Sequence, residues 1–301
     1  YDIMDDMHEW IDKNKINWAY LSRNKNPAAI KLLQQNPNKI DWNQLSMNEN
    51  HAAIKLLEQH SDKINWTYFS GNKNPAAIKL LKEKLKENPD EIDWCYLSMN
   101  ENPAAIRLLK ENQDKINWQR LSRNENLEAI KLLKEKLKVN PDEIDWLYLS
   151  RNKNPAAIQL LEQYPNKIDW YHLSMNENTA AIELLKQHQD EIDWTGLSRN
   201  KNPAAIQLLE QYPNKIDWDF LSSNENPAAI KLLEQYPKNI YWAHLSMNEN
   251  PAAIKLLEQN QDKINWIHLS RNENPAAIKL LKQNQDKINW ERLSSNPAIF
   301  K

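Results

Sequence analysis

Glycine and cysteine are nearly absent from this chain, which has only two glycines and one cysteine among its 301 residues. The scarcity of glycine, together with 15 prolines and many asparagines, indicates helices joined by Asn and Pro. The single cysteine, Cys95, excludes an intrachain disulfide framework and is typical of a protein from a reducing compartment.

Long apolar runs and an excess of one charge are also missing. No apolar run approaches the ~20 residues that a membrane-spanning helix needs. The acidic start, with Asp2, Asp5 and Asp6, lacks the features of a secretory signal. The 39 basic and 41 acidic residues give a net charge of −2, so bulk charge creates no attraction to nucleic acid or to an anionic membrane. We therefore expect an intracellular protein with no membrane partner.

What the chain does contain is a tryptophan that returns at fixed intervals. The spacing is 24 residues, apart from two intervals of 28 residues that end at Trp94 and Trp146. Around each Trp the chain repeats the phrase Ile-(Asp/Asn)-Trp-x-x-Leu-Ser-x-Asn-x-Asn-Pro-Ala-Ala-Ile-x-Leu-Leu. A short fixed period indicates an array of small units, none of which can bury its own apolar face. The recurring residues are Trp18, Trp42, Trp66, Trp94, Trp118, Trp146, Trp170, Trp194, Trp218, Trp242, Trp266 and Trp290.

The first half of each unit predicts a short helix, which we call helix A. In the unit around Trp42, Asp41 is a good N-cap. Trp42, Leu45 and Ser46 fall on one helical face, because they are three and four residues apart. We expect Asn48 to end the helix, since asparagine tolerates the left-handed conformation that many C-caps adopt.

The second half of each unit predicts a longer helix, which we call helix B. Asn50 is expected to cap it, and most units place proline at the first helical position, as in Asn26-Pro27. The phrase Ala-Ala-Ile-x-Leu-Leu is apolar around most of the helix, so helix B should be buried between its neighbours. The recurring Asn pairs should form columns that cap backbone groups along the array. In the 28-residue units, four extra residues such as 82–85 should lengthen helix B by about one turn.

These patterns predict an all-α protein, an α-solenoid or superhelix of about twelve stacked αα-hairpins. Each hairpin has 24 residues, apart from the two units of 28 residues. We expect an N-terminal capping helix over residues 1–15, because Met4, Met7 and Trp10 belong to one apolar stripe of an acidic segment. Residues 16–301 should form a single continuous repeat array.

Three positions in helix A vary from repeat to repeat, whereas packing alone explains the positions that barely change. They lie one, two and five residues after each Trp and share the face opposite Trp and Leu, and we call them the helix A strip. Tyr, Arg and Met, which are enriched at the cores of protein interfaces, are frequent in the strip. The candidate binding residues are Tyr20, Arg23, Gln44, Met47, Tyr68, Tyr96, Met99, Arg120, Arg123, Tyr148, Arg151, His172, Met175, Arg199, Phe220, His244, Met247, His268 and Arg271.

Several interpretations of the strip stay open. An aromatic stripe at helical spacing usually means packing, so the rings could be buried against the neighbouring helix A. Alternatively, the strip recognises another protein or a peptide. Single-stranded nucleic acid is less favoured, because binding its phosphates would require a column of positive charge. Seven residues after each Trp, four lysines are mixed with seven glutamates, which argues against such a column.

Catalysis, a metal site and a cofactor have little support. Serine follows Leu, or Phe in one repeat, in all twelve repeats from Ser22 to Ser294, but no His and Asp recur beside it. A small residue that allows close approach of helices explains these serines better. His244 and His268 occupy equivalent positions in adjacent repeats, but two histidines without carboxylate or thiolate companions make a poor metal site. We expect no enzymatic activity, no metal and no cofactor.

The repeated phrase resembles tandem-repeat proteins of giant DNA viruses that infect amoebae. The resemblance is carried, for instance, by residues 168–173 and 202–209 and by the closing residues 296–300, and it covers nearly the whole chain. It implies a viral protein that acts in the host cytoplasm or in a virion. It implies no catalytic or binding residues.

The sequence therefore predicts a protein–protein interaction scaffold whose partner is another protein or a peptide. One alternative is a structural or virion-associated repeat protein that self-associates end to end. The other, weaker alternative is a protein that binds single-stranded nucleic acid along helix A.

Overall fold

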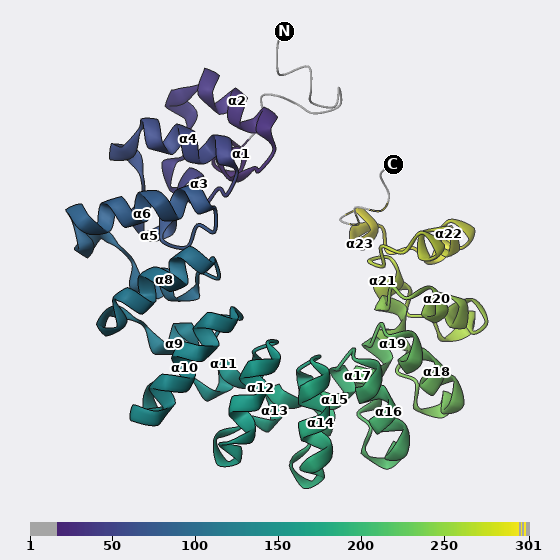
Figure 1. The fold of residues 1–301 in the computed structure, drawn as a ribbon. Helices are drawn as coiled ribbons and strands as arrows, with labels where there is room; N and C mark the ends of the chain where they lie inside the picture. The colour runs from purple at the N-terminus through teal and green to yellow at the C-terminus, as the bar shows by residue number, and fades with distance from the viewer. Residues whose placement is uncertain (1–16, 295, 297, 299–301) are drawn as a thin grey trace. The chain divides into compact units, whose positions relative to one another are not determined.

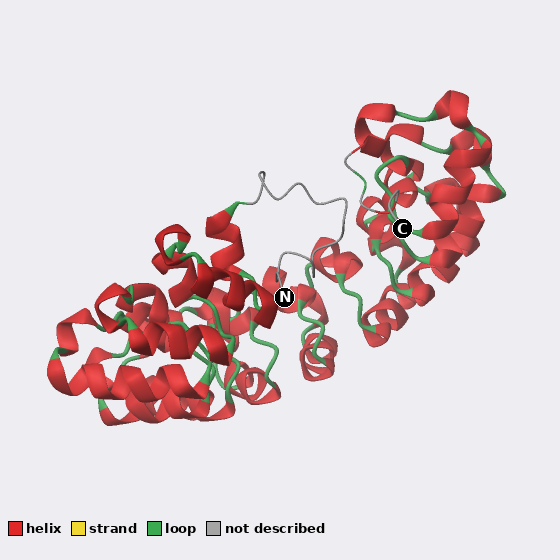
Figure 2. Cartoon of the chain, turned by 90° about the horizontal axis from the view of Figure 1, so that it is seen from above, coloured by secondary structure: helices red, strands yellow, loops and turns green. Residues whose placement is uncertain are grey.

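The computed structural model describes residues 17–294, 296 and 298, and every regular element in that part of the chain is a helix (Figure 2). The repeating pairs of short helices confirm the prediction of an all-α helical-repeat solenoid. The predicted N-terminal capping helix over residues 1–15 lies outside the described residues.

Helix A begins at the tryptophan of every repeat. The residue before it, Asp or Asn in all but one described repeat, adopts an extended backbone and caps the helix; Asp41, for example, accepts a hydrogen bond from the Gln44 backbone N–H at 3.0 Å. Tyr241 is the exception and makes no capping bond with its side chain. The A helices are α1 (Trp18–Arg23), α3 (Trp42–Ser46), α5 (Trp66–Phe69), α7 (Trp94–Met99), α9 (Trp118–Leu121), α11 (Trp146–Arg151), α13 (Trp170–Met175), α15 (Trp194–Arg199), α17 (Trp218–Ser223), α19 (Trp242–Met247), α21 (Trp266–Leu269) and α23 (Trp290–Ser294).

Helix B follows after a connection of three to five residues and buries its apolar phrase. In α16, for example, Ala205, Ile206, Leu208 and Leu209 are all buried. The small alanine permits close approach of the neighbouring helices, and the larger side chains fill the space between them. The B helices are α2 (Pro27–Gln35), α4 (His51–Gln59), α6 (Pro75–Glu87), α8 (Pro103–Glu111), α10 (Leu127–Val139), α12 (Pro155–Glu162), α14 (Thr179–Gln187), α16 (Pro203–Gln211), α18 (Pro227–Gln235), α20 (Pro251–Glu258) and α22 (Pro275–Gln283).

A 3₁₀ turn that the repeat pattern does not reveal connects each helix B to the next helix A. It carries the chain to a buried isoleucine, such as Ile216, which immediately precedes the next N-cap. The turns are η3 (Pro37–Lys39), η4 (Ser61–Lys63), η5 (Pro89–Glu91), η6 (Gln113–Lys115), η7 (Pro141–Glu143), η8 (Pro165–Lys167), η9 (Gln189–Glu191), η10 (Pro213–Lys215), η11 (Pro237–Asn239), η12 (Gln261–Lys263) and η13 (Gln285–Lys287).

The two 28-residue units lengthen helix B, as predicted. Helices α6 and α10 have 13 residues each, whereas α8 between them has nine. The added turn keeps its phase, because Leu137 is buried on the same face as Leu133.

The contacts divide the chain into two compact units, residues 1–156 and residues 157–301. In the second unit the A helices α13 to α21 form one layer and the B helices α14 to α22 form the other (Figure 1). The same alternation of A and B helices builds the first unit, where α1 packs on α2 and α3. The single continuous array expected over residues 16–301 stays a prediction.

The expected left-handed C-cap of helix A is wrong. No non-glycine residue in the described part of the chain has a positive φ angle. Asn100, which follows α7, has φ −75° and ψ 113°, an extended conformation. This conformation leaves its side chain free to bind the neighbouring repeat.

Candidate interaction surface of helix A

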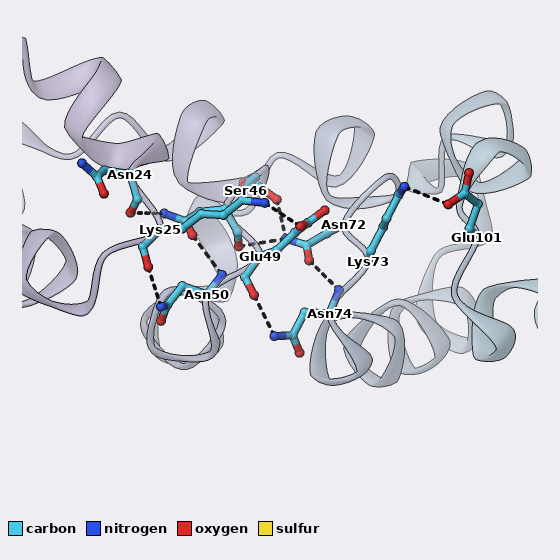
Figure 3. Close-up of polar contacts among 10 residues, drawn as sticks. Asn24, Lys25, Ser46, Glu49, Asn50, Asn72, Lys73, Asn74 and Glu101 are labelled. Carbon is cyan, nitrogen blue, oxygen red and sulfur yellow. Dashed lines mark hydrogen bonds and ion pairs between the residues drawn. The ribbon is translucent and has the colours of Figure 1, made fainter. Parts of the chain in front are cut away.

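Adjacent repeats are joined by asparagine side chains at the junction of helices A and B, which we call the Asn ladder (Figure 3). The Asn72 amide donates to the backbone carbonyls of Ser46 and Asn48 in the preceding repeat, at 3.1 and 3.0 Å. Its side-chain oxygen accepts from the Asn74 backbone N–H at 3.0 Å. Asn74 in turn donates to the Glu49 carbonyl at 2.9 Å and caps α6. The predicted columns of capping asparagines are therefore present, and they also tie each repeat to the one before it.

The recurring serine belongs to the same network. Ser46 is fully buried; its hydroxyl donates to the Trp42 carbonyl at 2.7 Å and accepts from the Asn65 backbone N–H of the next repeat at 2.9 Å. Close packing was the expected role, and the burial agrees with it. The hydroxyl adds a hydrogen bond between repeats that an alanine could not make.

The Asn ladder is unchanged by the length of helix B. Across the longer 28-residue step, the Asn100 amide still donates to the carbonyls of Ser70 and Asn72, at 3.2 and 2.9 Å. Because the ladder fixes how one helix A lies on the next, the same two strip positions meet between consecutive repeats.

In that arrangement, the residue five places after one Trp lies against the residue two places after the next Trp. The Arg123 guanidinium stacks 3.5 Å from the Tyr148 ring centroid, and the Arg199 guanidinium lies 3.6 Å from the Phe220 ring centroid. Arg199 also donates to the Tyr171 hydroxyl at 3.1 Å. These cation–π contacts hold long arginine side chains in place on the surface.

Both glycines of the chain lie at the contact between the fifth strip position of one repeat and the second strip position of the next. Gly71 occupies the fifth position, and in the absence of a side chain the Tyr68 and Tyr96 rings meet edge to face, with centroids 6.2 Å apart. Gly196 occupies the second position of its repeat and is buried; an added Cβ would lie 2.8 Å from the Tyr171 carbonyl oxygen and 3.3 Å from Met175. Glycine is needed there because the neighbouring backbone approaches so closely.

The candidate residues of the strip are neither fully buried nor uniformly free. Rings in the second position were expected either to be buried or to be available for recognition, and most of them are half-buried against the neighbouring helix. The exposed candidates are Tyr20, Arg23, Tyr96, Arg151, Met247 and Arg271. The half-buried candidates are Gln44, Met47, Tyr68, Met99, Arg120, Arg123, Tyr148, His172, Met175, Arg199, Phe220, His244 and His268. Recognition through the strip stays a prediction.

Two histidines in the strip of the second unit have charged surroundings. The Nδ1 atom of His244 lies against the Asp219 carboxylate, which comes from the preceding helix A. Burial lowers the pKa of His268, and the positive charges of His244, Arg271 and Arg292 lower the same pKa further. His268 is therefore biased toward its neutral form.

Charges of both signs line the edge of the A helices, seven residues after each Trp. Lys25 pairs with Glu49 at 2.8 Å, and Lys73 pairs with Glu101 at 3.2 Å (Figure 3). Lys201 and Glu225 form the equivalent pair in the second unit, at 3.0 Å. Much of the lysine charge at this position is thereby balanced within the molecule, which weakens the case for phosphate binding at this edge.

Most repeats also cover their own tryptophan, a contact that the sequence did not predict. In several repeats the cover is a ring from the end of helix B; the Tyr212 and Trp194 rings, for instance, have centroids 5.2 Å apart. In others it is a lysine, such as Lys136 over Trp118 at 4.9 Å. Apart from Trp118 and Trp290, the repeat tryptophans are half-buried. The tryptophans thus serve to hold each repeat together.

No protein-family model, curated protein or solved structure matches this chain. Among the described residues, no helix is both long enough and apolar enough to cross a membrane.

Proposed function

We propose that the protein is an interaction scaffold that binds another protein or a peptide along the helix A strip. One observation carries the proposal: exposed apolar surface is concentrated on the A helices. Of the eight large apolar side chains that are exposed among the described residues, six belong to a helix A or its N-cap. Contiguous exposed apolar surface marks interaction sites more often than scattered single side chains do. The six are Tyr20, Tyr96, Tyr241, Met247, Ile267 and Trp290.

Three of these side chains lie on neighbouring helices of the second unit. Tyr241 is the N-cap of α19, Met247 is the last residue of α19 and Ile267 lies on α21; their exposed fractions are 54%, 42% and 51%. An exposed tyrosine and an exposed methionine are residue types that protein interfaces favour. The arginines add pre-organised donors, because Arg199 is already stacked on Phe220 and loses little freedom on binding. We take α19 and α21 as the centre of the contact.

The chain supplies its own replacements for a test. Equivalent positions elsewhere carry Asp217 for Tyr241, Ser223 for Met247 and Thr195 for Ile267. The triple variant Tyr241→Asp, Met247→Ser, Ile267→Thr should therefore fold, and Tyr241→Asp should restore the missing N-cap of α19. We expect the tagged variant to lose the partners that the wild-type chain recovers from cell extract, quantified by mass spectrometry.

A matched control removes the two exposed apolar side chains of helix B. Leu127→Pro and Val139→Glu use the residues found at the equivalent positions Pro75 and Glu87. This control should recover the wild-type partners. Full recovery of every partner by the triple variant would overturn the proposal. Light scattering of the wild-type chain and the triple variant distinguishes a foreign partner from self-association, since only self-association changes the mass of the purified protein.

The resemblance to repeat proteins of giant viruses supports a second part of the proposal, namely that the protein acts in an infected cell or in a particle. Extract from infected amoebae is therefore the first source to test. Recovery of the same partners from uninfected cells alone would count against this part.

A further inference from the structure

The B helices of the first unit carry a local positive charge that the net charge of the chain conceals. Together α6, α8 and α10 contain ten basic and five acidic residues. In the second unit the five helices α14 to α22 contain five basic and four acidic residues. The excess is therefore a property of three consecutive repeats rather than of helix B in general.

The cations of this surface stand in two rows across the three helices. One row holds Lys79, Arg107 and Lys131, and the other holds Lys82, Lys110 and Lys134, each at equivalent positions of consecutive repeats. All six side chains are exposed. Within the described residues, Lys131 is paired with Glu128, and no ion pair involves the other five. Five of the six positive charges are thus available to a ligand.

Two grooves lie between adjacent helices of this surface, and cations of both rows line them. The groove between α6 and α8 has a volume of about 320 Å³ and is lined by Pro75, Ile78 and Ala104 beneath Lys79, Lys82 and Arg107. The groove between α8 and α10 has a volume of about 210 Å³ and again includes Arg107. Side chains with an apolar end can enter grooves of this kind while carboxylates reach the cations above.

We propose that the surface of α6, α8 and α10 binds an acidic amphipathic helix of a partner protein. Neighbouring packed helices are about 8–10 Å apart, so the cations of one row repeat at that distance. Carboxylates seven residues apart on an α-helix are about 10.5 Å apart, which matches this spacing. Alternate residues of an extended peptide are only about 6.6 Å apart and match it less well. The ligand helix lies across the three B helices, with its acidic residues over the two rows.

Acidic residues in the same surface favour a protein ligand over a polyphosphate. Glu111 lines the first groove, and Glu128 and Glu135 line the second. They would repel a continuous chain of phosphates but leave room for separated carboxylates. Helices α6, α8 and α10 also contain no aromatic residue on which a base could stack.

The test uses the full chain and a synthetic probe. A fluorescein-labelled peptide of about 21 residues consists of three seven-residue repeats and carries glutamates at seven-residue intervals, with leucines between them. A scrambled peptide of the same composition distributes the glutamates around the helix. Fluorescence anisotropy at about 50 mM and about 500 mM salt measures affinity and its dependence on screening. We expect the patterned peptide to bind more tightly than the scrambled one and to weaken at high salt.

Two triple variants with the same charge change identify the surface. Lys79→Gln, Arg107→Gln, Lys131→Gln removes one row in the first unit, and Lys231→Gln, Lys255→Gln, Lys279→Gln removes the equivalent lysines in the second. Glutamine is native at this position in α16, as Gln207, so both variants should keep the wild-type circular dichroism and melting curve. We expect about a tenfold loss of affinity, about 1.4 kcal/mol, for the first variant and less than about a twofold loss for the second.

Equal losses in the two variants would overturn the proposal, because the binding would then reflect net charge alone. Failure of the wild-type chain to bind, or to distinguish the patterned peptide from the scrambled one, would overturn it as well. A DNA duplex that binds more tightly than the peptide, and through the first row, would assign the surface to nucleic acid instead. Loss of partners by the helix A strip variant in the pull-down would not change these results, because the strip lies on helix A and the peptide surface lies on helix B.

Discussion

The Asn ladder and the helix A strip both join neighbouring repeats, but they differ in how much their residues vary. The ladder uses the same serine and asparagines in 24- and 28-residue units and makes the same backbone bonds in each. In the strip, only the contact between the fifth position of one repeat and the second position of the next recurs. Residues as different as arginine, methionine and glycine make this contact. Stacking is therefore specified by the ladder, and the strip is left free to change without loss of the fold.

The difference lies in what each contact satisfies. Ladder side chains bond to buried backbone carbonyls and N–H groups, which would otherwise lose their hydrogen bonds at a cost in stability. The stacked strip side chains meet other half-buried side chains, and their loss exposes some surface to water without removing a partner of the backbone. Substitutions should accordingly fall into a destabilising class and a mild class.

The largest effect is expected for Asn200→Ala. The buried Asn200 amide donates to the carbonyls of Ser174 and Asn176, both at 2.9 Å, and its oxygen accepts from the Asn202 N–H. Loss of three hydrogen bonds, two of them fully buried, at about 1 kcal/mol each should lower the free energy of unfolding by about 3 kcal/mol. Urea denaturation followed by circular dichroism measures the change. Asn202→Ala removes a half-buried cap and an exposed hydrogen bond to the Glu177 carbonyl, and should cost only about 1 kcal/mol. Equal losses for the two variants would contradict this difference between the asparagines.

Ser198→Ala should give the next largest effect. The Ser198 hydroxyl donates to the Trp194 carbonyl at 2.7 Å and accepts from the Asp217 N–H of the next repeat at 3.0 Å. Because the substitution leaves that partly buried N–H unpaired, we expect a loss of about 1–2 kcal/mol in urea unfolding. Ser223→Ala is the matched control, since the Ser223 hydroxyl is exposed and bonds only within its own helix. An equal loss in the free energy of unfolding for Ser223→Ala would show that the Ser198 hydroxyl does not stabilise the contact between repeats.

A double-mutant cycle on Arg199 and Phe220 tests the strip itself. The half-buried stacked pair should show a coupling energy of about 0.5–2 kcal/mol, the range between exposed and desolvated cation–π contacts. Thermal or urea unfolding of Arg199→Ala, Phe220→Ala and the double variant gives the coupling. Strictly additive losses would mean that the two side chains only happen to lie close together.

The sequence predicted the elements that depend on one repeat alone. The start of helix A at Trp42 follows from the Asp41 cap and the apolar spacing, and the longer α6 follows from four added residues in phase. The Asn columns were also predictable, because each asparagine precedes a helix start. These features depend on local capping and on helical periodicity, which a sequence displays directly.

Features that depend on two repeats could not be predicted. The partner of the Ser46 hydroxyl is a backbone N–H from the next repeat, and that geometry is known only when the repeats are stacked. The pairing of the fifth strip position with the second follows from the phase that the ladder imposes. The left-handed C-cap was a wrong prediction for the same reason. Asn100 adopts an extended backbone, and its side chain donates to backbone carbonyls of the preceding repeat. The one signal of such contacts in the sequence was the serine that recurs in the repeats at a position where alanine would pack equally well.

The smallest expected effect concerns pH and the strip residue His268. Burial, the first cause, and three nearby positive charges lower the pKa of His268 in the folded chain below its ordinary value of about 6.5. The unfolded chain therefore binds a proton on this residue at a higher pH than the folded chain does. Stability contributed by neutral His268 is complete above about pH 7 and is lost as the pH falls through about 6.5 toward the lowered pKa. His268→Gln, which places the residue of Gln44 at the equivalent position, should reduce the decline in melting temperature between about pH 7 and pH 5. Parallel pH profiles for the wild type and the variant would show that His268 titrates alike in the folded and unfolded chains, and that this part of the strip is as open to water as a solvated surface.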